Sequence, residues 1–212
     1  MAYYLQTIMI LTQHNGKKLA YYNIPKCGKT TVKSILKDLK NQGGSYKSHT
    51  PLFYSPLKDF QSREALRFTV VREPVARFIS SYNNRIADRD DFQSSIVSRN
   101  LVKPFKLNPS PSLEEFALNI HTYGLLNDRV FRHVINQHRF TGKNIEKFDR
   151  IYNLSQINDL VDYMNDLFNI ELQAKTLNSS SKQSSKVDLS SEALSRVQEY
   201  YEMDYKLFGK YF

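Results

Sequence analysis

Hydrophobic residues form two kinds of pattern along this chain: short continuous runs and stripes at helical spacing. The runs TIMIL (7–11) and LAYYNI (19–24) are rich in β-branched and aromatic residues. They flank Asn15-Gly16, a dipeptide typical of a tight β-hairpin turn. After the second run, apolar residues recur three and four positions apart until Gly43-Gly44, at Val32, Ile35, Leu36 and Leu39. The pattern therefore predicts two strands, a loop and a helix.

The same order of strand, turn and helix occurs again further along. RFTVV (67–71) predicts a strand that leads into Arg72-Glu73-Pro74, where the proline fits the first turn of a helix. DRIYNL (149–154) predicts a third strand, and the apolar stripe from Ile157 to Phe168 predicts the helix after it. The stripe after Pro74 shares one helix face: Val75, Phe78, Ile79, Tyr82 and Ile86.

The remaining segments carry weaker signals. Residues 45–49 fit a short strand, and 88–111, which are polar and contain prolines, predict a long loop. Ser112 and Glu115 fit a capping box at the start of a helix. We also expect a helix over 126–138, a low-complexity loop over 178–186 and a last helix from Ser190 or Ser191.

Strands that alternate with helices indicate an α/β fold with a central, mainly parallel sheet flanked by helices. In such sheets ligands bind at the carboxyl ends of the strands. Two turns, 25–31 and 72–74, follow predicted strands directly. They are therefore the first places to look for chemistry.

Size and composition restrict the class of protein. With 212 residues and no internal repeat, the chain suits a single domain over 1–212. One cysteine excludes an intramolecular disulfide framework, and the N-terminal apolar run is too short to span a bilayer and lacks a signal-peptide pattern. We therefore expect a soluble, cytoplasmic protein with no membrane partner. The net charge of +9 fits an anionic ligand, although a lysine-rich solvated surface would give it too.

The turn after the second run admits a nucleotide-binding interpretation. Gly28-Lys29-Thr30 fits the end of the Walker loop of kinases and ATPases, whose first glycine would fall at Asn23. Such enzymes also need an aspartate at a strand end to hold magnesium, and the strand over 67–71 is followed by Arg72 instead. The kinase interpretation therefore rests on half a motif.

A second interpretation covers the whole turn. The segment Pro25-Lys26-Cys27-Gly28-Lys29-Thr30-Thr31 resembles the P-K-x-G-x-T-x loop of sulfotransferases, which binds the 5′-phosphosulfate of 3′-phosphoadenosine-5′-phosphosulfate (PAPS). The physical chemistry agrees, because Gly28 lets backbone N–H groups approach an anion and Thr30 and Thr31 offer hydroxyls at a helix start. Lys26 adds a cation, and none of these contacts requires a metal.

The second turn supports the same resemblance. Residues 70–82, VVREPVARFISSY, are similar to the V-R-[DE]-P-x-x-R-x-x-S-x-Y segment of that superfamily, in which the arginine and the first serine hold the nucleotide 3′-phosphate. The resemblance assigns this role to Arg72 and Ser80, and a guanidinium suits a phosphate through paired hydrogen bonds. Because Arg77 and Ser80 lie three residues apart, we expect them to face the same ligand.

Weaker similarity extends over most of the chain. His133 and Gln137 fit the H-x-x-x-Q stretch of the carbohydrate-directed, family 2-type sulfotransferases. TLNSSSK (176–182) and EYYEMDYKLFGKYF (199–212) are similar to the closing loop and final helix of that branch. The resemblance implies a P-loop-like three-layer fold, PAPS as co-substrate and no metal. Two residues depart from the family pattern: Lys29 occupies a position that is commonly small, and Ser155 replaces a frequent glutamate.

Sulfuryl transfer needs a cation at the leaving oxygen and a base for the acceptor hydroxyl. We assign the first task to Lys26. His49 is our first choice as base, since Lys47-x-His49-x-Pro51 resembles the K-x-H-x-P site of several sulfotransferases, and a neutral imidazole has a suitable pKa. His133 is the second choice, whereas His14 and His121 look structural.

The acceptor is a hydroxyl compound, and basic residues around 88–111 favour an acidic saccharide, although simple solvation explains them as well: Arg85, Arg89, Arg99, Lys103 and Lys106. Three alternatives remain open. They are a P-loop small-molecule kinase, a basic nucleic-acid-binding module and a catalytically inactive nucleotide-binding relative. The nucleic-acid module lacks a zinc pattern or an RNP-type strand, so we expect no nucleic-acid partner. The oligomeric state is not predicted.

Overall fold

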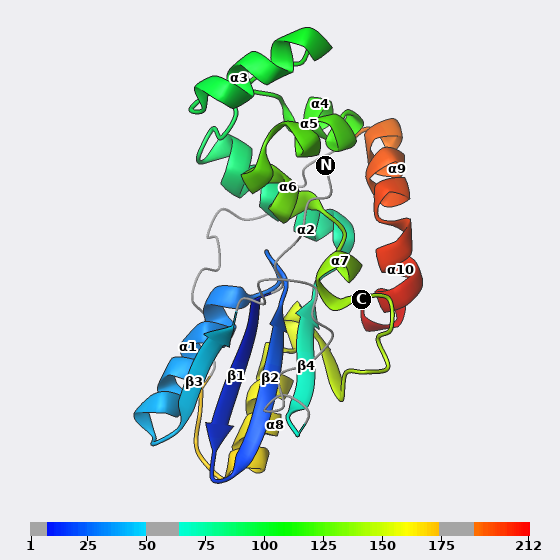
Figure 1. Cartoon of the computed structure of the whole chain (residues 1–212). Helices are drawn as coiled ribbons and strands as arrows, with labels where there is room; N and C mark the ends of the chain where they lie inside the picture. Colours follow the sequence, from blue (N-terminus) through cyan, green and yellow to red (C-terminus); the bar gives the residue numbers. More distant parts are fainter. Residues whose placement is uncertain (1–7, 50–63, 174–188) are drawn as a thin grey trace. The chain divides into compact units, whose positions relative to one another are not determined.

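A computed structural model describes residues 8–49, 64–173 and 189–212 (Figure 1). Their contacts divide the chain into two compact units. The first unit comprises Met1–Arg72, Gln137–Ser181 and Lys210–Phe212, and the second comprises Glu73–Asn136 and Lys182–Gly209. The predicted low-complexity loop over 178–186 lies outside the described residues.

The first unit is built on a five-stranded sheet in the order β3-β1-β2-β4-β5. β1 pairs antiparallel with both β2 and β3, whereas β4 pairs parallel with β2 and with β5. All the strands except β1 therefore run in the same direction, and the predicted α/β class with a mainly parallel sheet is confirmed. The strands are β1 (Ile8–His14), β2 (Lys17–Asn23), β3 (Ser45–His49), β4 (Leu66–Val71) and β5 (Arg150–Asn153).

The hairpin between β1 and β2 forms where the sequence predicted it. Asn15 and Gly16 both have positive φ, 48° and 74°, as a two-residue type I′ turn requires. This turn fixes the register of the pairing, in which Ile10 faces Tyr21 and Met9 faces Tyr22. Side chains then alternate between the two faces of the sheet.

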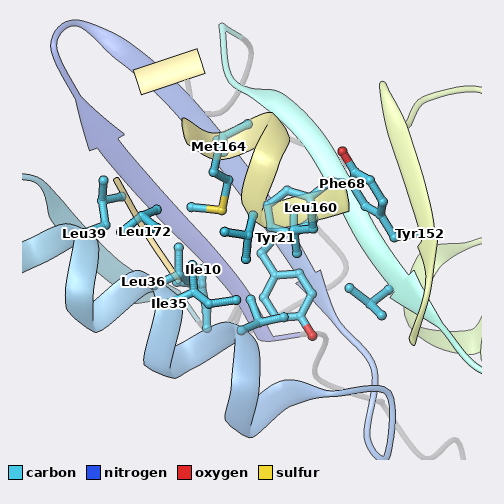
Figure 2. Packing of buried hydrophobic residues seen from close by; sticks show 14 of the residues in the cluster. Ile10, Tyr21, Ile35, Leu36, Leu39, Phe68, Tyr152, Leu160, Met164 and Leu172 are labelled. Atoms are coloured by element: carbon cyan, nitrogen blue, oxygen red, sulfur yellow. The ribbon is translucent and has the colours of Figure 1, made fainter. Parts of the chain in front are cut away.

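Two helices cover one face of this sheet (Figure 2). α1 (Lys29–Asn41) and α8 (Ile157–Phe168) carry their apolar stripes onto strand residues such as Tyr21 and Phe68, whose rings stack at 5.1 Å. The helix residues in this core are Val32, Ile35, Leu36 and Leu39 from α1, and Leu160, Val161, Met164 and Phe168 from α8. The opposite face holds a smaller cluster of Ala20, Tyr22, Ala65 and Phe148. The packing of α1 and α8 on the sheet agrees with the predicted α/β fold.

The strand register brings several strand ends to one edge. Met9 of β1 pairs with Tyr22 on one side and with His49 on the other. Because β2 and β3 run in the same direction, their carboxyl ends lie at the same edge of the sheet. β4 and β5 end at this edge too, since both run parallel to β2. The turn after β2 and the residue after β4 therefore leave the sheet from one side.

The second unit is helical. Its largest buried side chains include Phe78, Phe116, Tyr123 and Tyr201, and the rings of Phe78 and Phe116 stack at 5.4 Å. Within the described residues its helices are α2 (Pro74–Tyr82), α3 (Ile96–Val102), α4 (Leu113–Leu118), α5 (Ile120–Leu126), α6 (Asp128–Val134), α9 (Ser191–Tyr200) and α10 (Glu202–Phe208). α2 continues into a π-helical turn over Asn83–Ala87.

Two sequence expectations about these helices were wrong. The segment 88–111 is not one long loop, because Ser95 caps α3 by accepting from the Ser98 backbone N–H, and Val102 is buried. The helix expected over 126–138 is interrupted. Ile135 has an extended backbone (ψ 148°), so α6 ends at Val134 and α7 (His138–Thr141) starts separately. No helix among the described residues has the length and apolar character needed to cross a membrane.

Candidate active site

The turn after β2 is closed by a hydrogen bond from the Cys27 backbone N–H to the Ile24 carbonyl at 3.3 Å. Pro25 supplies the first central residue, and Lys26, with φ 68°, supplies the second. This is the arrangement of a type II turn, in which the second central position normally carries glycine or asparagine. A lysine in this conformation costs roughly 1 kcal/mol, and such strain is typical of functional sites.

Gly28 connects this turn to α1. Its φ of 75° is left-handed, and a Cβ atom at this position would lie 2.6 Å from Leu154 Cδ1. Gly28 is also the N-cap residue, and as a glycine it makes no side-chain cap hydrogen bond to α1. The first N–H groups of a helix have no intrahelical partner, so the start of α1 presents donors to an anion. In contrast, the carboxylate of Glu73 caps α2 by accepting from the N–H groups of Val75 and Ala76.

The residues after Gly28 form the first turn of α1. Thr30 is exposed, whereas Lys29 and Thr31 are half-buried. Burial, and secondarily the charge of Lys33, lower the pKa of the Lys29 ammonium below its ordinary value. A cation that is partly desolvated and close to another cation is stabilised when an anion binds next to it.

Arg72 follows β4 directly and reaches the same turn. Its Nη1 donates a hydrogen bond to the carbonyl oxygen of Lys26 at 3.4 Å, across 46 residues of sequence. The structure therefore brings together Lys26 and Arg72, which the sequence placed in two separate motifs. Both belong to the first unit.

Gln137, for which the sequence predicted no role, joins these two turns. It is fully buried, and its Oε1 accepts from the Arg72 backbone N–H at 3.0 Å and from Cys27 Sγ at 3.2 Å. Its Nε2 donates to the Arg72 carbonyl at 2.9 Å. Its place in the H-x-x-x-Q stretch was the only signal in the sequence that singled it out.

Of the two candidate bases, the structure describes the side chain of His133 but only the backbone of His49. His49 is the last residue of β3 and pairs with Met9, so its backbone lies at the sheet edge from which the turn 24–28 leaves. Its side chain and Pro51 lie outside the described part of the chain. His133 belongs to the second unit, where its Nδ1 lies 2.7 Å from the Arg129 carbonyl. A carbonyl only accepts, so Nδ1 carries the proton and a neutral ring has Nε2 as its basic atom.

Ser80 lies half-buried on α2 in the second unit, and its predicted contact with the nucleotide stays a prediction. Arg77, on the same helix, does not share a ligand face with it. Its side chain is fully buried and its guanidinium lies 6.0 Å from the centre of the Tyr201 ring. The expectation for Arg77 was wrong because a cation over an aromatic ring forms part of the core of this unit.

The expectation that Arg85 is one of the basic residues available to an acidic acceptor was also wrong. It is buried, with its Nε 2.6 Å from Oδ2 of the buried Asp91. Burial lowers the pKa of Arg85, and the charge of Asp91 opposes this shift. The other four basic residues of this set are exposed or half-buried: Arg89, Arg99, Lys103 and Lys106.

Among the described residues, no group of three or more His, Cys, Asp or Glu side chains could hold a metal ion. The predicted capping box forms only in part: the Ser112 hydroxyl accepts from the Glu115 backbone N–H and caps α4. The Glu115 carboxylate instead accepts from the Tyr123 hydroxyl and from the Asn108 backbone N–H. The rings of His14 and His121 pack against Phe168 and Tyr200, in agreement with structural roles.

Ser155, where the family often has glutamate, serves a local purpose in this chain. Its backbone N–H and its hydroxyl both donate to Asn153 Oδ1, at 3.0 and 3.1 Å. These bonds start the short 3₁₀ turn Leu154–Gln156 that leads into α8. The hydroxyl of Ser155 thus stabilises the start of a helical segment at a position where the family often has a carboxylate.

These features define a class of protein. A glycine-containing turn leads from a mainly parallel sheet into an uncapped helix, and an arginine from the next strand contacts that turn, as expected of a P-loop-like phosphate-binding protein. A family model described as "Sulfotransferase family" matches residues 9–211. Because the match spans nearly the whole chain, the chain belongs to the sulfotransferase family. Searches among curated proteins and among solved structures gave no match.

Family membership confirms the predicted resemblance and identifies the chain as an enzyme. Sulfotransferases of this family use PAPS as the sulfuryl donor and a hydroxyl group as the acceptor. The finding decides against the kinase and against the nucleic-acid-binding module. The acceptor and the roles of individual residues are taken up below.

Proposed function

We propose that the enzyme transfers the sulfuryl group of PAPS to a hydroxyl of an acidic saccharide, and that Pro25–Thr31 and Arg72 hold the nucleotide. The observation that carries this proposal is the hydrogen bond between Arg72 Nη1 and the Lys26 carbonyl. It supports a single anion site made from both sequence motifs. The residues Pro25, Cys27, Gly28, Lys29, Thr30 and Thr31 then contribute mainly through the backbone and hydroxyls of the turn.

The charge of this turn suits a polyanionic nucleotide without a metal ion. Lys26, Lys29 and Arg72 supply cations, and the start of α1 supplies uncapped N–H donors. Burial, and secondarily the charge of Lys33, lower the pKa of Lys29, which indicates that this ammonium is partly desolvated. An anion with several charges would stabilise the charged form of Lys29, so the donor set fits the phosphosulfate end of PAPS.

PAPS supplies an activated sulfuryl group, and the protein must stabilise the charge that develops on the departing phosphate oxygen. We assign this task to Lys26, helped by N–H groups of the turn. His49 is assigned as the base for the acceptor hydroxyl, because its backbone lies at the same sheet edge. His133 remains the second candidate, and Ser80 the second ligand for the 3′-phosphate, both on the resemblance to the family.

An acidic saccharide is favoured by the cationic segment of the second unit. Arg89, Lys103 and Lys106 are exposed, and Arg99 is half-buried. Their charges can attract sulfate or carboxylate groups of a glycan chain, although exposed charges interact weakly with a single partner charge. We also keep, as predictions, a single domain over 1–212 and a cytoplasmic location.

The test is a titration with adenosine 3′,5′-bisphosphate (PAP) in the presence of EDTA, followed by a PAPS-dependent assay. PAP binding without metal, together with product formation on sulfated or uronic-acid oligosaccharides, would support the proposal. ATP with magnesium serves as the control ligand. Tight PAP binding without transfer to any alcohol, phenol or saccharide would instead identify a catalytically inactive relative. Absence of PAP binding by folded protein would refute the nucleotide site.

A further inference from the structure

Gln137 contacts both turns of the proposed nucleotide site through buried hydrogen bonds. Its amide exchanges two bonds with the backbone of Arg72, from Arg72 N–H to Oε1 at 3.0 Å and from Nε2 to the Arg72 carbonyl at 2.9 Å. The third contact is from Cys27 Sγ to the same Oε1 at 3.2 Å, across 110 residues of sequence. One side chain therefore bonds the residue after β4 and the turn after β2.

The pair between Gln137 and Arg72 imitates the pairing of two strands. In an antiparallel sheet, opposed residues exchange an N–H···O bond in each direction, and the Gln137 amide offers the same donor and acceptor. Arg72 is the residue beyond the end of β4. The amide thus pairs both backbone groups of Arg72, and it fixes the backbone from which the Arg72 guanidinium extends to Lys26.

The contact with Cys27 restrains the other turn. Cys27 is fully buried and its N–H closes the turn that holds Lys26 at positive φ. A strained turn persists only where its surroundings determine its conformation. Two hydrogen bonds help to determine the conformation of this turn. One runs from the Cys27 thiol to Gln137 Oε1, and the other from the Arg72 guanidinium to the Lys26 carbonyl.

We propose that Gln137 is a positioning residue that holds Arg72 and the Pro25–Gly28 turn in the geometry that binds the nucleotide. The inference rests on the proposed nucleotide site. It assigns Gln137 no contact with substrate, since its side chain is buried and bonded to protein atoms. Replacing this amide by an apolar group would remove its bonds to the backbone of Arg72 and to the Cys27 thiol, and would loosen both turns together.

Gln137→Leu tests the proposal, because leucine has a similar volume and no polar atoms. Thr69→Val is the matched control. Thr69 is fully buried in the same sheet, and its hydroxyl donates one bond at 2.8 Å to the carbonyl of Tyr22, a strand residue outside both turns. We expect Gln137→Leu to weaken PAP binding by about 10- to 100-fold, the effect of losing one or two positioned interactions. Thr69→Val should bind PAP like the unmodified protein.

A second measurement needs no nucleotide. Cys27 is the only cysteine of the chain, so the rate of thiol labelling reports directly on opening of the turn. We expect Gln137→Leu to be labelled about tenfold faster or more than Thr69→Val, a difference that corresponds to a turn that opens more easily. Equal labelling rates and equal PAP affinities in the two variants would overturn the proposal.

Gln137→Glu provides the test if Gln137→Leu does not fold. At neutral pH a carboxylate cannot donate to the Arg72 carbonyl, but a protonated carboxyl group can. Relative to the unmodified protein, PAP binding of this variant should therefore improve as the pH falls through the pKa of the new carboxyl group. A ratio of affinities that does not change with pH would contradict the positioning role. If the unmodified protein itself fails to bind PAP, the proposed function is wrong, and thiol labelling still decides whether Gln137 holds the turn.

Discussion

The guanidinium of Arg72 donates to the carbonyl oxygen of Lys26 at 3.4 Å. This bond joins the residue after β4 to the turn after β2, so that Arg72 of the second sequence motif contacts the first motif. A guanidinium carries several N–H donors in a planar fork, and a bond to the turn is therefore compatible with paired bonds to a phosphate. Arg72 supports the turn, and in the proposed nucleotide site it would also recognise a phosphate.

Arg72→Lys should fail to replace the arginine. An ammonium keeps the charge but cannot make paired bonds while it also reaches the Lys26 carbonyl. We expect PAP affinity to fall by about 10- to 100-fold in Arg72→Lys and further in Arg72→Ala, as measured by calorimetric titration. Lys18→Ala removes an equal charge from the same unit, where Lys18 pairs with the exposed Glu64 at 3.1 Å. If this control weakens binding as much, the effect comes from net charge and not from the fork.

Lys26→Gly separates the chemistry of Lys26 from the strain of its turn. Glycine adopts a φ of 68° without penalty, so the melting temperature should stay the same or rise. Turnover should nevertheless fall by about a hundredfold or more, because the cation next to the departing oxygen is lost. Melting curves and single-turnover rates measure the two effects. A stable variant with normal turnover would remove Lys26 from the mechanism.

Lys29→Met should stabilise the protein in the absence of nucleotide and weaken its complex. The pKa of Lys29 is lowered in the folded state by burial and by Lys33, so its charged form destabilises the fold. The loss of folding stability caused by the charged ammonium is fully present below the pKa of Lys29 in the folded state. It disappears as the pH rises through that pKa toward the higher pKa of the unfolded chain. The variant should therefore melt higher, by roughly 1–3 °C near neutral pH, and the advantage should shrink under alkaline conditions. PAP affinity should fall, and an advantage that grows with pH would contradict the assignment.

Gly28→Ala and Gly16→Ala form a matched pair, since φ is 75° at one position and 74° at the other. Each should lose about 1–2 kcal/mol of unfolding free energy through the left-handed backbone. At Gly16 no atom lies within 4 Å of the added Cβ, whereas at Gly28 it would meet Leu154 Cδ1 at 2.6 Å. Gly28→Ala should therefore be at least as destabilised, as measured by denaturant unfolding, and only this variant should lose PAP affinity. Equal PAP affinity in both variants would show that the turn tolerates a side chain.

The sequence was sufficient for those parts of the site that depend on local patterns. The hairpin at Asn15-Gly16, the strand before Arg72 and the start of α1 each follow from residues close together in the chain, and all three are found. The role of Gln137 could not be derived in this way. Its partners Cys27 and Arg72 are 110 and 65 residues away, and only the folded backbone brings a lone amide between them.

Charged residues show the same limit. Arg77 and Arg85 look like surface cations in the sequence, because arginine is seldom buried. In the structure Arg77 lies over the Tyr201 ring, and Arg85 pairs with Asp91. Helical spacing indicates which residues share a face, but it does not tell a ligand-facing arginine from one that is neutralised in the core.

The pair Arg85–Asp91 gives a direct test of this distinction. Arg85→Ala leaves the carboxylate of Asp91 buried without its partner, and we expect a loss of about 3–5 kcal/mol of unfolding free energy. Arg89→Ala, at an exposed neighbouring position, should change stability by less than about 0.5 kcal/mol. If the cationic segment binds an acidic saccharide, Arg89→Ala should instead raise the KM for that acceptor and leave the KM for PAPS unchanged. Added salt should reduce this difference, because screening weakens exposed charge interactions. An acceptor KM that is insensitive to both Arg89→Ala and salt would point to an uncharged acceptor.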